Sequence, residues 1–142
     1  MFNTPNINRS SSLGESQEDY LEAILILEKD HRTVRVKDIA GLLGVSRPSV
    51  VVALAALAGK GLIRHEHYGG VELTPTGRKV AETVYQRHQL LVTFLRRIVG
   101  VSAAVAEADA CRLEHSLSPV TLNRLRVLIS RMNVSRPGTK DE

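Results

Sequence analysis

The sequence is poor in the features that would place a protein outside the cell or in a membrane. It holds one cysteine among 142 residues, so the chain cannot form an internal disulfide. No apolar signal segment opens it, and no uncharged apolar run reaches the roughly 18–20 residues that a membrane span requires. We therefore expect a soluble, cytoplasmic protein with no membrane partner.

Internal repeats of fixed period and a nucleophile signature are missing as well, and no catalytic residues are predicted. A hydrophobic content of 43% in a chain of this length is enough for one modest core or for two small lobes that share one. The net charge of +4 and the pI near 9.6 favour an anionic partner. An excess of this size is also common in proteins that bind no nucleic acid, so composition alone does not assign a function.

Three helices are predicted in the first half of the chain. The first carries a helical apolar period and begins after Ser16, its predicted N-cap. A short second helix covers residues 36–43 and is broken by Gly44. The third is capped by Ser46 and runs to Gly61.

A hairpin is predicted directly after these helices. Residues 62–67 and 71–74 alternate in polarity around the turn at 68–70, where two glycines supply the positive φ that a tight turn demands. The order of helix, short helix, glycine turn, helix and hairpin predicts a winged helix-turn-helix, whose third helix enters the major groove of DNA.

The remaining segments complete the predicted domain organisation. Residues 15–74 form the winged helix-turn-helix DNA-binding domain, and residues 75–133 carry one long and two shorter helices of an all-helical second domain. Residues 1–14 and 134–142 have little periodic apolar content, which predicts a disordered N-terminal segment and a flexible tail. The predicted fold class is mainly α.

The start of the third helix carries the predicted contacts to DNA. Arg47 is the chief hydrogen-bonding reader of bases, and Val51 and Val52 could pack on thymine methyl groups. Two simpler explanations remain open. The third helix is apolar nearly all round, as a fully buried helix is. Any one basic residue could be a solubilising charge and not a phosphate contact. The candidate DNA-binding residues are Arg35, Lys37, Ser46, Arg47, Pro48, Ser49, Val51, Val52, Lys60 and Arg64.

A metal site is predicted around residues 111–115, which read Cys-Arg-Leu-Glu-His. On a helix the cysteine, glutamate and histidine would be spaced i, i+3 and i+4, on one face and within reach of one ion. Taken singly, each candidate has a structural explanation, such as a packed cysteine or acidic residues near a helix N-terminus. Together they favour a metal site, whose candidate ligands are Asp19, Glu22, His88, Cys111, Glu114 and His115.

Four motifs resemble those of the diphtheria toxin repressor family. They are Ser-Gln-Glu-Asp-Tyr-Leu-Glu-Ala-Ile at 16–24, Leu-Thr-Pro-Thr-Gly at 73–77, Arg-His-Gln-Leu-Leu at 87–91 and the segment 111–115. The resemblance implies a homodimeric repressor that binds double-stranded operator DNA when loaded with Fe²⁺ or Mn²⁺. It also implies the short, two-domain form of the family, in which metal would clamp one domain to the other and the second domain would dimerise.

The resemblance assigns a mixed metal site. Cys111 stands where the manganese-responsive branch has a glutamate, whereas Asp19 stands where the iron-responsive branch has a methionine. The second, ancillary site of the iron branch is not expected intact, because Val92 and Glu107 replace a carboxylate and a histidine. The metal is predicted to be Mn²⁺ or Fe²⁺, with Zn²⁺ and Co²⁺ as further possibilities, since thiolate favours softer ions than carboxylate does.

Two other functions remain open at this point. One is a winged-helix protein that binds DNA without metal and uses its second domain only to dimerise. The other is a metallo-hydrolase, in which a carboxylate would act as base on a metal-bound water. The predicted function is a metal-dependent repressor of metal-uptake genes, and not an enzyme.

Overall fold

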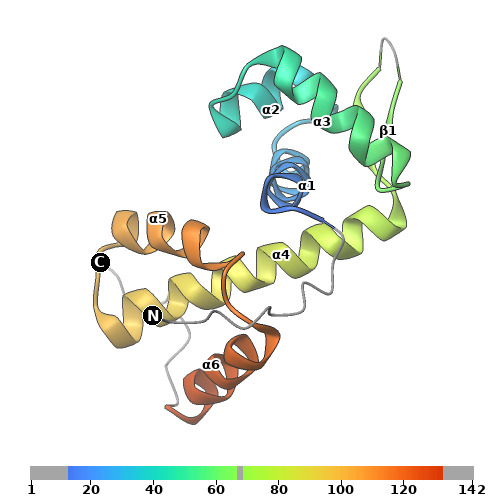
Figure 1. Cartoon of the computed structure of the whole chain (residues 1–142). Coiled ribbons are helices and arrows are strands. Elements are labelled where there is room, and N and C mark those ends of the chain that lie inside the picture. The colour runs from blue at the N-terminus through green and yellow to red at the C-terminus, as the bar shows by residue number, and fades with distance from the viewer. Residues whose placement is uncertain (1–12, 67–68, 133–142) are drawn as a thin grey trace, which may run out of the picture. The chain divides into compact units, whose positions relative to one another are not determined.

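The computed structural model describes residues 13–66 and 69–132, which fall into two compact units, 1–85 and 86–142 (Figure 1). The described residues confirm the mainly α fold class. Disorder was predicted for residues 1–14 and 134–142. Of these, only Leu13 and Gly14 belong to the described residues. The helices and strands, in chain order, are α1 (Glu15–Leu27), α2 (Val36–Leu43), α3 (Arg47–Gly59), β1 (Ile63–His65), β2 (Val71–Leu73), α4 (Pro75–Phe94), the π-helix η1 (Leu95–Val99), α5 (Ala103–Leu113) and α6 (Pro119–Arg131).

The predicted helix-turn-helix of the first unit is confirmed as α2 and α3. Gly44 ends α2 in the left-handed region, at φ 65°, which a residue without Cβ adopts at no steric cost. The Ser46 hydroxyl accepts the Ser49 N–H and so caps α3 as predicted. Among the described residues no single helix is long and apolar enough to cross a membrane, and only the bent pair α2 and α3, at 110°, reaches that length and composition together.

The predicted start of the first helix and the predicted end of the third helix need correction. Helix α1 begins at Glu15 after Gly14, whose N-cap position makes no side-chain hydrogen bond, so Ser16 lies inside the first turn. Helix α3 ends at Gly59, two residues before the predicted end, because Gly61 has left the helix with φ 72°.

Although α3 is apolar nearly all round, it is not buried all round: one face is buried and the opposite face is exposed. Val50, Leu54 and Leu57, spaced by four and three residues, are fully buried in a core with α1 and α2. Val51 and Val52, by contrast, are 49% and 71% exposed. This exposure is consistent with the predicted packing of the two valines on thymine methyl groups, which stays a prediction.

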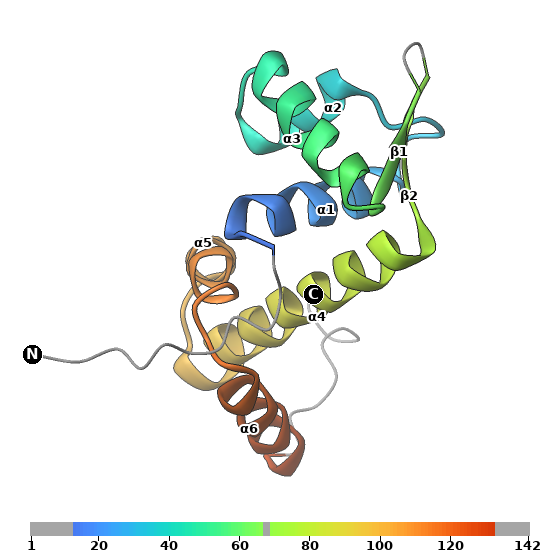
Figure 2. The ribbon, with the colours of Figure 1, turned by 45° about the vertical axis from the view of Figure 1, so that its right-hand side comes forward.

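The wing is an antiparallel pair of short strands that follows α3 (Figure 2). Arg64 pairs with Glu72 at its centre, and the paired residues span three positions on each strand, fewer than the predicted 62–67 and 71–74. Residue 68 of the predicted turn and residue 67, the end of the first predicted strand, lie outside the described residues. The positive φ predicted for the two glycines of this turn is wrong, because neither Gly69 nor Gly70 adopts the left-handed region.

The start of α4 is fixed against the base of the wing. Thr74 accepts the Gly77 N–H at 3.0 Å through its hydroxyl, which also donates to the Gly61 carbonyl at 2.7 Å. A Cβ placed on Gly77 would lie 1.8 Å from the carbonyl oxygen of Leu62. Only glycine fits at this position, because backbone, and not a flexible side chain, fills the space.

All the regular secondary structure in the described residues of the second unit is helical, as predicted. Helix α4 continues into it and ends in one π-helical stretch, after which Gly100 adopts φ 86°. The side chains of Ser102 and Ser118 cap α5 and α6. A small core joins the three helices, and it consists of Leu91, Val92, Leu95, Ala106, Ala110 and Leu122.

Candidate metal centre

The most buried charged residue of the described chain is Glu114, at the C-terminal end of α5. It is 1% exposed, and its backbone N–H still donates to the Ala110 carbonyl at 2.9 Å. Helix α5 ends at Leu113, so Glu114 and His115 lie in the turn that follows it and not on the predicted helical face. The next helix begins a few residues later, where Ser118 is the N-cap and Pro119 opens the first turn.

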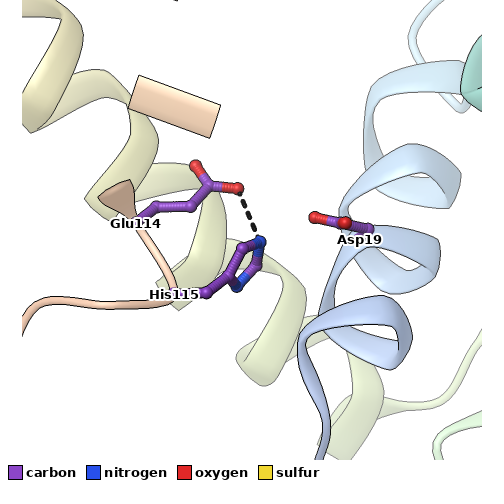
Figure 3. A group of neighbouring side chains, drawn as sticks. All are labelled: Asp19, Glu114 and His115. Carbon is purple, nitrogen blue, oxygen red and sulfur yellow. Dashed lines mark ion pairs between the residues drawn. The ribbon is translucent and has the colours of Figure 1, made fainter. Parts of the chain in front are cut away.

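Two histidines hold the Glu114 carboxylate. His88 Nδ1, from α4, lies 2.8 Å from Glu114 Oε2, and His115 Nε2 lies 3.2 Å from Glu114 Oε1. Figure 3 shows the His115 ring turned toward the carboxylate. The side chains of His88 and His115 are themselves only 11% and 4% exposed, so all three groups are withdrawn from solvent.

The second nitrogen of His88 meets another carboxylate. His88 Nε2 lies 2.6 Å from Glu107 Oε2, on α5, and the Glu107 side chain is 57% exposed. From the sequence, Glu107 is expected only as the residue that replaces a histidine of the ancillary site. The signal that could have found it is its spacing, since residue 107 lies seven positions, or two helical turns, before residue 114.

The charge of Glu114 is set by opposing effects. Desolvation by burial raises the pKa of its carboxyl group, but hydrogen bonds and charge from His115 and His88 outweigh burial, and the pKa lies below the ordinary value of 4.5. Glu114 is therefore a carboxylate at neutral pH, able to bind a cation without first losing a proton.

The donor set of this unit fits a divalent transition metal. One buried carboxylate flanked by two imidazoles offers oxygen and nitrogen ligands of the kind that Mn²⁺, Fe²⁺ and Zn²⁺ share. A buried carboxylate is costly unless it is paired, and both of its partners here are themselves metal-binding side chains. Nothing in the arrangement resembles a nucleophile with its base.

The other predicted ligands are placed as follows. Asp19 and Glu22 lie one turn apart on α1 of the first unit, and Glu22 is 9% exposed (Asp19 is drawn in Figure 3). Cys111 lies one turn before Glu114 on α5; it forms no disulfide, and the residue is exposed. Within the second unit, the structure thus brings together His88, Glu114 and His115.

The candidate DNA-binding residues share one property, which is that all ten are exposed. Ser46, Arg47, Pro48 and Ser49 form the open N-terminal turn of α3, where Ser46 and Ser49 hydroxyls lie 2.8 Å apart. Lys60, at the other end of the helix, donates to Gln17 Oε1 at 2.7 Å.

Two family models match nearly the whole described chain. The N-terminal DNA-binding domain of iron-dependent repressors matches residues 12–71, and their metal-binding and dimerisation domain matches residues 74–141. The chain belongs to the iron-dependent repressor family. The resemblance to the diphtheria toxin repressor family is thereby confirmed, and with it the assignment of the chain as a metal-dependent, DNA-binding transcriptional regulator.

Relatives within this repressor family agree with that assignment. The chain is 37% identical to the transcriptional regulator MntR of Escherichia coli O6:H1, over 87% of this chain and 79% of that protein. It is 39% identical to the HTH-type transcriptional regulator MntR of Geobacillus kaustophilus, over 80% of each chain.

Solved structures resemble this repressor family member in fold as well. A manganese-dependent transcriptional repressor in complex with manganese superposes with a TM-score of 0.75 at 31% identity, over 80% of this chain. The IdeR protein of T. acidophilum gives a TM-score of 0.69 at 29% identity, over 89% of this chain. The chain spans about half the length of these solved proteins, 52% and 57% respectively.

Proposed function

We propose that the chain is a cytoplasmic repressor of metal-uptake genes that binds double-stranded operator DNA as a homodimer when loaded with Mn²⁺ or Fe²⁺. The observation that carries the proposal is Glu114, a carboxylate buried to 1% exposure between two histidines, in a chain that also presents an open helix-turn-helix. Catalysis is not part of the proposal, since the transcriptional regulators of this family are not enzymes.

The proposed ligands come from both domains. His88, Glu114 and His115 supply the part whose geometry is described above, and the family resemblance adds Cys111 together with the two α1 carboxylates, Asp19 and Glu22. We keep the domain boundary between residues 74 and 75, which is supported by the two family models meeting between residues 71 and 74. A bound divalent cation supplies positive charge that the carboxylates of both domains share.

Because the proposed ligands belong to both domains, metal occupancy and DNA affinity become linked quantities. Asp19 and Glu22 are on the helix that packs against the helix-turn-helix, and His88 and Glu114 are in the dimerisation domain. A dimer whose recognition helices are held at one spacing binds DNA better than one in which they are not, so metal and operator favour the same state.

Operator binding with and without metal tests the proposal. Selection from a random duplex pool with Mn²⁺-loaded protein supplies the operator, and we expect a chelator to weaken binding to it by about 5–150-fold, the usual range of allosteric coupling. A random duplex of equal length is the control. Equal operator affinity in metal-free and Mn²⁺-loaded protein would show a winged-helix protein that needs no metal.

The DNA contacts are proposed from the exposed start of α3 and its surroundings. Arg47 reads base edges, and the exposed Val51 and Val52 contact thymine methyls, which require no hydrogen-bond donor. The phosphate contacts come from basic residues around the helix and from the wing, and the proposed contact residues in full are Arg35, Lys37, Ser46, Arg47, Pro48, Ser49, Val51, Val52, Lys60 and Arg64.

Cys111 is proposed as the residue that sets metal preference. Replacing Cys111 with alanine is expected to weaken Mn²⁺ and Co²⁺ binding alike, and replacing it with glutamate to shift preference toward Mn²⁺, because the site loses its soft donor. Co²⁺ titration of the three proteins checks this, since a thiolate ligand gives a sulfur-to-cobalt charge-transfer band. A parent protein without that band, and a glutamate variant of unchanged selectivity, would remove Cys111 from the site.

A further inference from the structure

The structure assigns Glu107 as a positioning residue that fixes the His88 ring for metal binding through Nδ1. This inference rests on the proposed metal-dependent function and adds a residue to it. Within the second unit, four side chains contact one another in a row, Glu107, His88, Glu114 and His115, and each nitrogen of the His88 ring meets a different carboxylate.

The two nitrogens of His88 differ in what they can bind. Nδ1 faces Glu114 Oε2 at 2.8 Å, and Glu114 is also the carboxylate that His115 contacts. An ion held jointly by His88 and Glu114 therefore lies on the Nδ1 side of the ring. A ring nitrogen that binds a metal carries no proton, so the proton of a neutral His88 then resides on Nε2.

Glu107 lies where that proton points. Its Oε2 is 2.6 Å from Nε2, a short distance for a hydrogen bond to a carboxylate. Metal-binding histidines usually donate their other N–H to a carboxylate or carbonyl, which selects the tautomer, fixes the ring and makes the ligating nitrogen more basic. Glu107 is in the position to do this for His88.

The two carboxylates that contact His88 differ in their exposure to solvent. The His88 side chain is 11% exposed and Glu114 is 1% exposed, whereas the Glu107 side chain is 57% exposed. The ring thus stands between a buried carboxylate and a solvated one. An exposed ion pair by itself stabilises little, so the contribution of Glu107 is expected in metal affinity more than in folding.

The test uses the full chain with three substitutions, Glu107→Gln, Glu107→Ala and the control Glu82→Gln, an exposed glutamate of α4. We expect Mn²⁺ affinity to fall roughly 10–100-fold in Glu107→Ala, the usual cost of losing such a partner, and less in Glu107→Gln, whose amide oxygen still accepts a hydrogen bond. The control should bind as the parent does.

Nitrogen-15 NMR of the Zn²⁺-loaded protein provides a readout that a merely structural role would not move. The parent should show a protonated His88 Nε2 with a slowly exchanging proton, and Glu107→Ala should lose that slow exchange. An unprotonated Nε2 in the parent would overturn the inference, since Nε2 would then have no proton to donate to Glu107. Equal Mn²⁺ affinity in all variants would overturn it as well.

These readouts separate the inference from the proposed function. Metal affinity and the His88 spectrum are measured without DNA. If the Glu107 variants show the expected effects but the protein binds operator equally with and without metal, only the proposed function is contradicted. If operator affinity depends on metal but Glu107→Ala leaves Mn²⁺ affinity unchanged, only the role assigned to Glu107 is contradicted.

Discussion

Replacing Glu114 with glutamine is expected to abolish the effect of metal on DNA binding. The amide keeps the shape of the side chain but removes the negative charge that His88 and His115 share, and it is a far weaker metal ligand. Because Glu114 would bind the ion directly, the fall in Mn²⁺ affinity should exceed the roughly 10–100-fold typical of a supporting residue such as Glu107.

The measurement is a Mn²⁺ titration together with operator binding in the presence and absence of chelator. Glu82→Gln is again the matched control, because it makes the same chemical change at an exposed position of α4. Circular dichroism shows whether the Glu114→Gln protein is folded. A folded Glu114→Gln protein that keeps the full metal response would place the metal site elsewhere.

Replacing Gly77 with alanine is expected to destabilise the first unit strongly. The added methyl would lie 1.8 Å from the carbonyl oxygen of Leu62, so the wing and α4 would have to move apart. Overpacking of this kind typically costs about 1–3 kcal/mol, and contact with backbone puts this site at the upper end or beyond. Urea unfolding followed by circular dichroism measures the loss.

Gly41 is the matched control for this substitution. It also lies inside a helix, α2, but a Cβ there would meet no atom within 4 Å. Gly41→Ala should leave stability unchanged or raise it by about 0.4–1 kcal/mol, because alanine restricts the unfolded chain. Equal effects at the two positions would mean that the close approach of Gly77 to Leu62 does not exist in solution.

Local signals predicted the helix-turn-helix well. Gly44 and Ser46 carry conformational and hydrogen-bonding preferences that act within a few residues, so the bounds of α2 and the start of α3 follow from the sequence. The ends of α1 and α3 were predicted less well, since several residues there have similar preferences and helix ends vary by one or two residues.

The sequence names candidate ligands for the metal site, but it does not predict their geometry. Regular spacing placed Glu114 and His115 on a helix, whereas the helix ends before them. The buried Glu114 carboxylate contacts His88, which lies 26 residues away in the sequence. The contact of Glu107 with His88 joins residues on two helices 19 positions apart. Periodicity along α5 places Glu107 on the same face as Glu114, but it does not show that His88, on another helix, packs against both.

The DNA contacts proposed for the exposed valines of α3 would separate two components of DNA binding that respond differently to ionic strength. Phosphate contacts release condensed counterions, so the affinity that they supply falls steeply as salt is added. A contact between Val52 and a thymine methyl displaces water and releases no ion. Discrimination between operator and random duplex would thus persist at salt concentrations that remove most of the absolute affinity, while cooling would erode it, because apolar contacts weaken at low temperature.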